Sequence, residues 1–214
     1  MKKAVLISIR PKWCALIASG EKTIEVRRTR PDLATPFKCY IYCTQRQKPA
    51  LVNLQNLPET PYLMTTGNFS KKYELPDMDW ARLCNGKVIG EFICDEINDY
   101  VLYGGVLSEK RYVRMDMQQF AHPVNYDDMC LTPEEFATYA GGRRMYGWHI
   151  SGLTIYDEPK ALKDFKFKQF DACPFLSENG CDYPYHCFRA GETKRCGEFI
   201  DRPPQSWRYV EAQG

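Results

Sequence analysis

Short segments rich in β-branched and aromatic residues recur along this chain of 214 residues, whereas helical patterns are few and short. Segments of this kind, bounded by glycine, proline and polar residues, are typical of β-strands. Several strands with only two or three short helices predict an α+β or mainly β fold, a small mixed β-barrel with short flanking helices, rather than a parallel α/β sheet. The predicted strands cover residues 4–9, 23–28, 39–44, 86–97 and 146–157.

Two short helices flank the predicted strands. The first begins at Pro11, which suits the first turn of a helix, and it ends at Gly20. The second follows Thr132, which forms a capping-box pattern with Glu135, and it stops at Gly141.

The chain is expected to form one domain over residues 1–170 and a cysteine-rich extension over residues 171–214. Hydrophobic residues make up 44% of the sequence, which is enough for a packed core. Residues 49–84 and 104–130 lack sustained periodicity and are predicted to be insertions without regular structure. The sequence PPQSW, residues 203–207, predicts a turn that returns a C-terminal strand to the barrel.

Positive charge is concentrated near the start of the chain. Residues 1–48 hold 11 Lys and Arg residues against 3 acidic residues, although the net charge of the whole chain is only +2. Such an asymmetry indicates a localised anion-binding surface, and the alternative is a basic face that packs near an acidic one.

The strand predicted at residues 23–28 alternates apolar and polar side chains. Thr23, Glu25 and Arg27 share one face, and Lys22 precedes them at the turn between helix and strand. A carboxylate between cations can orient a guanidinium and leave other donors free for a phosphate or a base edge. The alternative is a solvated surface strand with ion pairs to its neighbour.

The stretch GEKTIEVR, residues 20–27, contains the pattern Gly-x-Lys-x-x-Glu-x-Arg with all four positions filled. It follows a strand that ends in ISIRP and a helix that ends in ASG. This arrangement resembles the opening of an ASCH (ASC-1 homology) domain, a branch of the PUA-like superfamily. The later segments YIYCT, NGKVIGEFICDEI, YGWHISGLTIYDEPKALKDF and RPPQSWRYVE resemble the longer ASCH proteins of bacteria and their phages.

The resemblance implies a PUA-like barrel with a cleft beside the motif, in which RNA or a modified nucleotide binds. In this chain the cleft would involve Arg10, Lys22, Glu25 and Arg27, and the later segments add Thr44 and Trp148. Trp148 could stack a base, as aromatic side chains do in single-strand binders. A place in the hydrophobic core is the alternative for this tryptophan.

Some small ASCH proteins are amidohydrolases that remove the acetyl group of N4-acetylcytidine, and this resemblance suggests hydrolysis as a second hypothesis. Those enzymes use a threonine nucleophile where this chain has Glu25, while Thr23 lies on the same face of the strand. An enzyme would therefore use Lys22, Thr23 and Glu25, and Lys22 would have to be neutral to act as a base. Lys22 is more simply a cation, so binding is favoured and no catalytic residue is assigned.

Other common catalytic patterns give no support to an enzyme. His122, His149 and His186 are not spaced as a triad with a serine or a cysteine. Cys14, Cys39 and Cys43 fall in a predicted helix and strand, where cysteines are commonly buried and inert.

Four cysteines of the C-terminal extension have the spacing C-x7-C-x5-C-x8-C. Four thiolates at tetrahedral positions form a closed structural zinc site, and a metal would replace the core that this apolar-poor segment lacks. The spacing of the first three cysteines resembles that of CCCH zinc fingers, but no histidine follows at the expected distance, and His186 is a possible substitute ligand. Free thiols or two disulfides are the alternatives. The proposed ligands are Cys173, Cys181, Cys187 and Cys196.

The sequence shows no feature of export or membrane insertion. The apolar run after the basic start ends at Arg10, too early for a signal-peptide core, and no stretch approaches the ~20 apolar residues that span a bilayer. A cytoplasmic protein with reduced cysteines and no membrane contact is expected. A third hypothesis is a protein-interaction module whose zinc loop docks a partner that the sequence does not identify.

Overall fold

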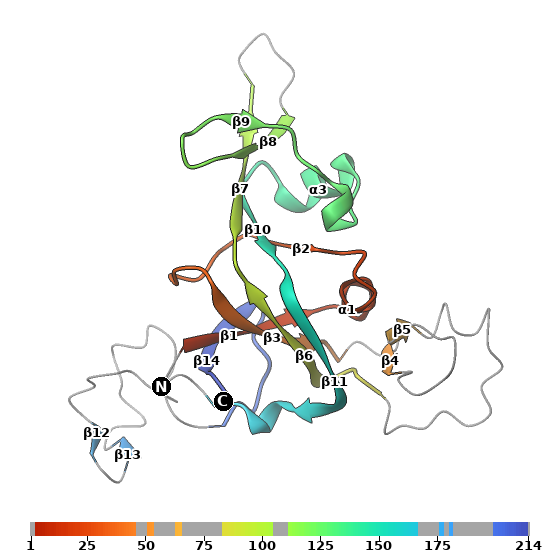
Figure 1. The fold of residues 1–214 in the computed structure, drawn as a ribbon, viewed down its shortest axis with the longest axis vertical. Helices are drawn as coiled ribbons and strands as arrows, with labels where there is room; N and C mark the ends of the chain where they lie inside the picture. The colour runs from red at the N-terminus through yellow and green to blue at the C-terminus, as the bar shows by residue number, and fades with distance from the viewer. Residues whose placement is uncertain are drawn as a thin grey trace, which may run out of the picture.

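The computed structural model describes residues 3–45, 51–53, 63–65, 83–104, 111–166, 176–177, 180–181 and 199–213. For the four short segments 51–53, 63–65, 176–177 and 180–181 it describes only the backbone. Within this part of the chain, about half of the residues belong to β-strands, far more than belong to helices, and the longer strands form two five-stranded sheets (Figure 1). The prediction of a mainly β fold with short helices is therefore confirmed.

The first sheet contains the N-terminal and C-terminal strands of the described chain. Strand β1 (Lys3–Ile9) pairs in parallel with β3 (Phe37–Cys43) and antiparallel with β14 (Trp207–Glu211), so the C-terminal strand does return to the strand that begins the fold. The order of strands is β11 (Ser151–Ala161), β6 (Lys87–Cys94), β3 (Phe37–Cys43), β1 (Lys3–Ile9) and β14 (Trp207–Glu211).

The second sheet is antiparallel and carries the charged strand of the motif at one edge. Strands β8 (Arg111–Met115) and β9 (Ala121–His122) of this sheet lie near the top of Figure 1, with helix α3 (Pro133–Ala140) beside them. The order of strands is β2 (Ile24–Arg27), β10 (Met145–His149), β7 (Ile97–Tyr103), β8 (Arg111–Met115) and β9 (Ala121–His122).

Short helices and hairpins complete the described structure. The capping box predicted for the second helix is confirmed, because Thr132 Oγ1 accepts from the backbone of Glu135 and the Glu135 carboxylate accepts from the backbone of Thr132. These elements are α1 (Pro11–Ala18), α3 (Pro133–Ala140), the 3-10 helices η2 (Asp127–Met129) and η3 (Leu162–Asp164), and the strand pairs β4 (Leu51–Asn53) with β5 (Leu63–Thr65) and β12 (Leu176–Ser177) with β13 (Gly180–Cys181).

The described strands do not close into the single barrel that the sequence analysis predicted. The segments 86–97 and 146–157, each predicted as one strand, break at residues 95–96 and at Ile150 and pass from one sheet to the other. The two breaks lie together, since the amide of His149 donates to the carbonyl of Glu96 at 2.9 Å. Breaks of this kind let one strand serve two sheets, as at the corners of orthogonally packed sheets.

Trp148 lies in the core and not in a cleft, which corrects its assignment as a base-stacking residue. Its side chain is 0% exposed and packs edge-on against Phe37, with the Trp207 ring 5.9 Å away between centroids. The alternation of β10 places Trp148 opposite Glu25 of β2, on the face that packs toward the first sheet.

The two regions predicted to lack regular structure are only partly described. The described part of residues 104–130 contains β8, β9 and η2, so regular pairing was missed there. Of the proposed zinc ligands, Cys173, Cys187 and Cys196 lie outside the described residues, as does His186, and Cys181 is described only by its backbone in β13. Within the described part of the chain, no helix is long and apolar enough to cross a membrane.

Candidate functional site

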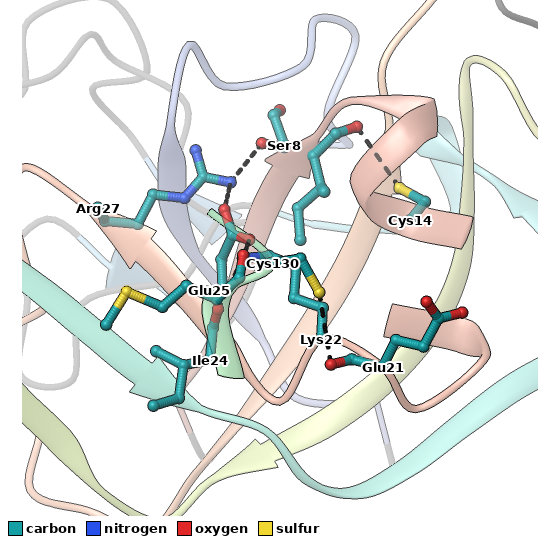
Figure 2. Close-up of polar contacts among 10 residues, drawn as sticks. Ser8, Cys14, Glu21, Lys22, Ile24, Glu25, Arg27 and Cys130 are labelled. Carbon is teal, nitrogen blue, oxygen red and sulfur yellow. Dashed lines mark hydrogen bonds and ion pairs between the residues drawn. The ribbon is translucent and has the colours of Figure 1, made fainter. Parts of the chain in front are cut away.

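Three charged side chains of the motif form one buried cluster at the edge of the second sheet. Lys22, Glu25 and Arg27 are only 3%, 6% and 8% exposed. The Glu25 carboxylate lies between the two cations, with Oε1 at 3.0 Å from Arg27 Nη2 and Oε2 at 3.5 Å from Lys22 Nζ (Figure 2). The formal charges of the three side chains sum to +1. Glu25 and Arg27 lie on the same face of strand β2, as the alternation of the sequence predicted.

The alternation of strand β2 separates the charged cluster from an apolar core. Ile24 and Val26 pack with Tyr100 of β7 and Phe136 of α3 on one side of the strand. Glu25 and Arg27 point to the opposite side, as the period of two requires. The apolar face thereby fixes the strand and holds both charged side chains in place.

Lys22 uses its three N–H donors within the protein. Its ammonium donates to the backbone carbonyls of Ile24 at 2.7 Å and Met129 at 2.9 Å, and it pairs with Glu25. Burial lowers the pKa of Lys22, while the negative charge of Glu25 opposes that effect. The Met129 carbonyl ends η2, a segment 107 residues away in sequence, which sequence reasoning did not connect with the motif.

Arg27 uses only part of its guanidinium. Nη2 donates to Glu25 and to the backbone carbonyl of Ser8 at 2.6 Å, and Figure 2 shows the guanidinium pointing toward both. Nε is buried without a hydrogen-bond partner, and Nη1 has none among the described residues. Since a guanidinium carries five N–H donors, Arg27 keeps donors for a ligand.

The cluster lines a cavity of about 540 Å3 between the end of β1, the start of α1, the edge strand β2, helix α3 and the turn before β14. The predicted residues Arg10, Lys22, Glu25, Arg27 and Thr44 all line it. Thr23 and Trp148 are not among the described residues that do so. The other lining residues are Ser8, Ile9, Trp13, Val26, Tyr42, Gln45, Leu131, Glu135, Tyr139, Pro203, Pro204 and Gln205.

Three aromatic residues that sequence reasoning did not assign to the site line the cavity, and two of them, Trp13 and Tyr139, are partly exposed. Trp13 of α1 is partly buried, and Lys22 Nζ lies 5.2 Å from the centroid of its ring. Tyr139 of α3 is 40% exposed, and the Arg28 guanidinium lies 5.2 Å from its ring centroid. The helical periodicity of α1 predicts which face of the helix Trp13 lies on, but it does not show that a cavity lies beside that face.

The cysteines of the described domain are not suited to nucleophilic chemistry. Cys14, Cys39 and Cys43 are buried as free thiols, as predicted. Burial raises the pKa of Cys14 and Cys39 well above the usual range, and it raises the pKa of Cys94 to about 12. A thiol with a raised pKa supplies little thiolate, which is the nucleophilic form.

Solved structures of an ASCH protein from Zymomonas mobilis are similar to this chain. One shares 17% sequence identity, covers 97% of this chain and 87% of that chain, and has a TM-score of 0.43. Two mutant forms of the same protein share 15% and 16% identity, cover 97% and 98% of this chain and 88% and 91% of theirs, and have TM-scores of 0.45 and 0.44. No protein-family model and no curated protein matches the chain.

Proposed function

We propose that the cavity binds a nucleotide, either free or as part of an RNA strand, and that the domain acts by binding. The observation that carries this proposal is the buried Lys22–Glu25–Arg27 cluster, which opens on a cavity with aromatic walls. A cavity of about 540 Å3 is within the range of pockets that enclose small ligands. The exposed cation Arg10 in the cavity wall suits a phosphate, and Trp13 and Tyr139 suit a base.

Equilibrium binding tests this proposal directly. The four ribonucleoside 5′-monophosphates and a short single-stranded oligoribonucleotide are titrated into the protein at two salt concentrations. At least one of these ligands is expected to bind, with an affinity that falls as salt rises, because phosphate contacts release counterions. Failure of every one of these ligands to bind would overturn the proposal.

A pair of arginine variants locates that binding in the cavity. Arg27→Ala removes the unused donors and is expected to weaken binding about 10- to 100-fold, the range for hydrogen bonds from a charged group. Arg144→Ala changes an exposed arginine that does not line the cavity and should have little effect. Thermal unfolding of both variants verifies that they fold, and equal losses of affinity would place the site elsewhere.

Hydrolysis of an acylated nucleoside is the second candidate, and the geometry gives it less support. Thr23, the hydroxyl considered as nucleophile, is not among the described residues that line the cavity. The Lys22 ammonium donates to two carbonyls and pairs with Glu25, an arrangement that favours the charged form over a neutral base. Incubation with N4-acetylcytidine is therefore expected to release no acetate, and turnover that Lys22→Ala abolishes would reverse this ranking.

We also propose that Cys173, Cys181, Cys187 and Cys196 hold one structural zinc ion. No group of residues in the described part of the chain could hold a metal, so stoichiometric zinc would point to the remaining segments. Metal analysis of the purified protein is expected to find about one zinc per chain, as a closed four-cysteine site requires. Cys187→Ser should abolish zinc binding, whereas Cys130→Ser, which changes a partly exposed free thiol, should leave the zinc content unchanged.

A zinc-stabilised module that docks a protein partner remains the third hypothesis. It predicts that loss of the metal disrupts a complex while nucleotide affinity is absent from the start. The binding titration described above therefore separates this hypothesis from the first.

A further inference from the structure

We infer that the nucleotide enters the cavity base-first. Arg27 and Thr44 bond the base edge, and the phosphate stays at the mouth of the cavity beside Arg10. Lys22 does not contact the nucleotide and only positions Glu25. This inference rests on the proposed function and deepens it, because it divides the cavity into a base subsite and a phosphate subsite. It also removes Lys22, the central residue of the motif, from direct contact with the ligand.

Lys22 is a positioning residue because its ammonium is saturated. An ammonium has three N–H donors. Two backbone carbonyls accept hydrogen bonds from Lys22, and the Glu25 carboxylate forms an ion pair with it. The bonds to Ile24 and Met129 tie the start of β2 to η2, and the ion pair fixes one oxygen of Glu25. A ligand could bond Lys22 only by displacing one of these buried partners.

Two lining residues, Arg27 and Thr44, have buried polar atoms without a partner, and these two residues define the deep end of the cavity. Arg27 Nε and Thr44 Oγ1 are both buried without a hydrogen-bond partner, and both residues line the cavity. A buried polar atom without a partner costs stability, and a ligand that supplies the missing bond recovers that cost. Arg27 offers donors only, whereas the Thr44 hydroxyl can donate and accept.

The charge around these atoms favours a neutral ligand group there. A phosphate bonded to Arg27 would lie beside the Glu25 carboxylate, which is 6% exposed and therefore poorly screened. A carbonyl oxygen or a ring nitrogen of a base accepts the same hydrogen bonds without that repulsion. The deep end of the cavity is thus matched to a base edge.

The mouth of the cavity has the properties that a phosphate needs. Arg10 lines the cavity, is exposed, and forms no ion pair with any residue that the structure describes. Trp13, three residues further along the chain, also lines the cavity and offers an aromatic face to the base. A nucleotide with its base against Trp13 and Arg27 would therefore leave its phosphate near Arg10.

The test compares each of the four ribonucleosides with its 5′-monophosphate in the full-length protein. A base-first site is expected to bind at least one nucleoside, with an affinity within about tenfold of its monophosphate, since one exposed charge contact adds only a little. Arg10→Gln should lower the affinity of the monophosphate to that of the nucleoside and leave the nucleoside unaffected. The affinity of the monophosphate should fall as the salt concentration rises, whereas the affinity of the nucleoside should not.

Variants of Thr44 test the base subsite. Thr44→Val, which keeps the shape and removes the hydroxyl, should weaken the nucleoside and the monophosphate equally, by about three- to tenfold for one hydrogen bond. Thr44→Ser keeps the hydroxyl and should retain most of the affinity.

Three results would overturn the inference while leaving the proposed function intact. They are binding of monophosphates without any binding of nucleosides, binding of the oligoribonucleotide alone, and a Thr44→Val variant with unchanged affinity. If neither nucleosides, monophosphates nor the oligoribonucleotide bind the unmodified protein, the proposed function itself fails, and the inference fails with it.

Discussion

Replacing Lys22 by methionine is expected to lower the free energy of unfolding by about 3–5 kcal/mol, the range found when one partner of a buried ion pair is removed. Methionine fills much of the same volume, so the loss would come from charge and hydrogen bonding. The Met129 carbonyl would lose its bond from Lys22, and among the described residues Glu25 would keep Arg27 as its only charged partner.

Lys38 provides a matched control on the first sheet. It also pairs with a glutamate, Glu91, and at a shorter distance of 2.8 Å, but its side chain is 30% exposed. Solvent screens such a pair, and Lys38→Met is expected to cost about 1 kcal/mol or less. Urea unfolding of both variants measures the difference, and equal losses would show that the motif cluster is no more than a surface ion pair.

The sequence was sufficient to find the charged strand and the faces of its side chains. A period of two places Glu25 and Arg27 on one side of β2 whatever the rest of the fold, because it follows from the geometry of an extended chain. The ends of α1 and α3 were likewise set by local signals, namely Pro11, the Thr132–Glu135 box and Gly141. These features depend on neighbours within a few residues.

The remainder of the site depends on contacts between distant segments, which one sequence does not reveal. Pro204 and Tyr139 line the cavity, and the Met129 carbonyl accepts from Lys22, all from segments more than 100 residues after the motif. The breaks at residues 95–96 and at Ile150, which replace a closed barrel by two sheets, lie within apolar runs that read equally well as continuous strands. Local sequence patterns therefore could not predict which distant residues complete the site, or that these strands are divided between two sheets.

The two tryptophans near the motif illustrate this limit and lead to a crossed prediction. Sequence analysis did not assign Trp13 to the site and proposed Trp148 for base stacking. In the structure Trp148 is 0% exposed in the core, whereas Trp13 is partly buried and lines the cavity. The two side chains should therefore affect different properties of the protein.

Trp148→Ala is expected to lower the free energy of unfolding by about 3–5 kcal/mol, the usual cost of deleting a buried aromatic side chain. The milder Trp148→Phe, which keeps an aromatic ring against Phe37, should leave nucleotide affinity within about twofold because Trp148 is not among the described lining residues. Urea unfolding and ligand titration measure the two effects on the same preparations.

Trp13→Ala should show the opposite balance. Its smaller buried area predicts a smaller loss of stability than Trp148→Ala, while the loss of base stacking should reduce binding by about 1–3 kcal/mol. Because the Lys22 ammonium lies 5.2 Å from this ring, part of the loss could come from the cluster, and Trp13→Phe separates the two by keeping an aromatic face. If Trp13→Ala leaves affinity unchanged while Trp148→Phe reduces it, the base does not stack on the α1 wall and the assignment of the cavity is wrong.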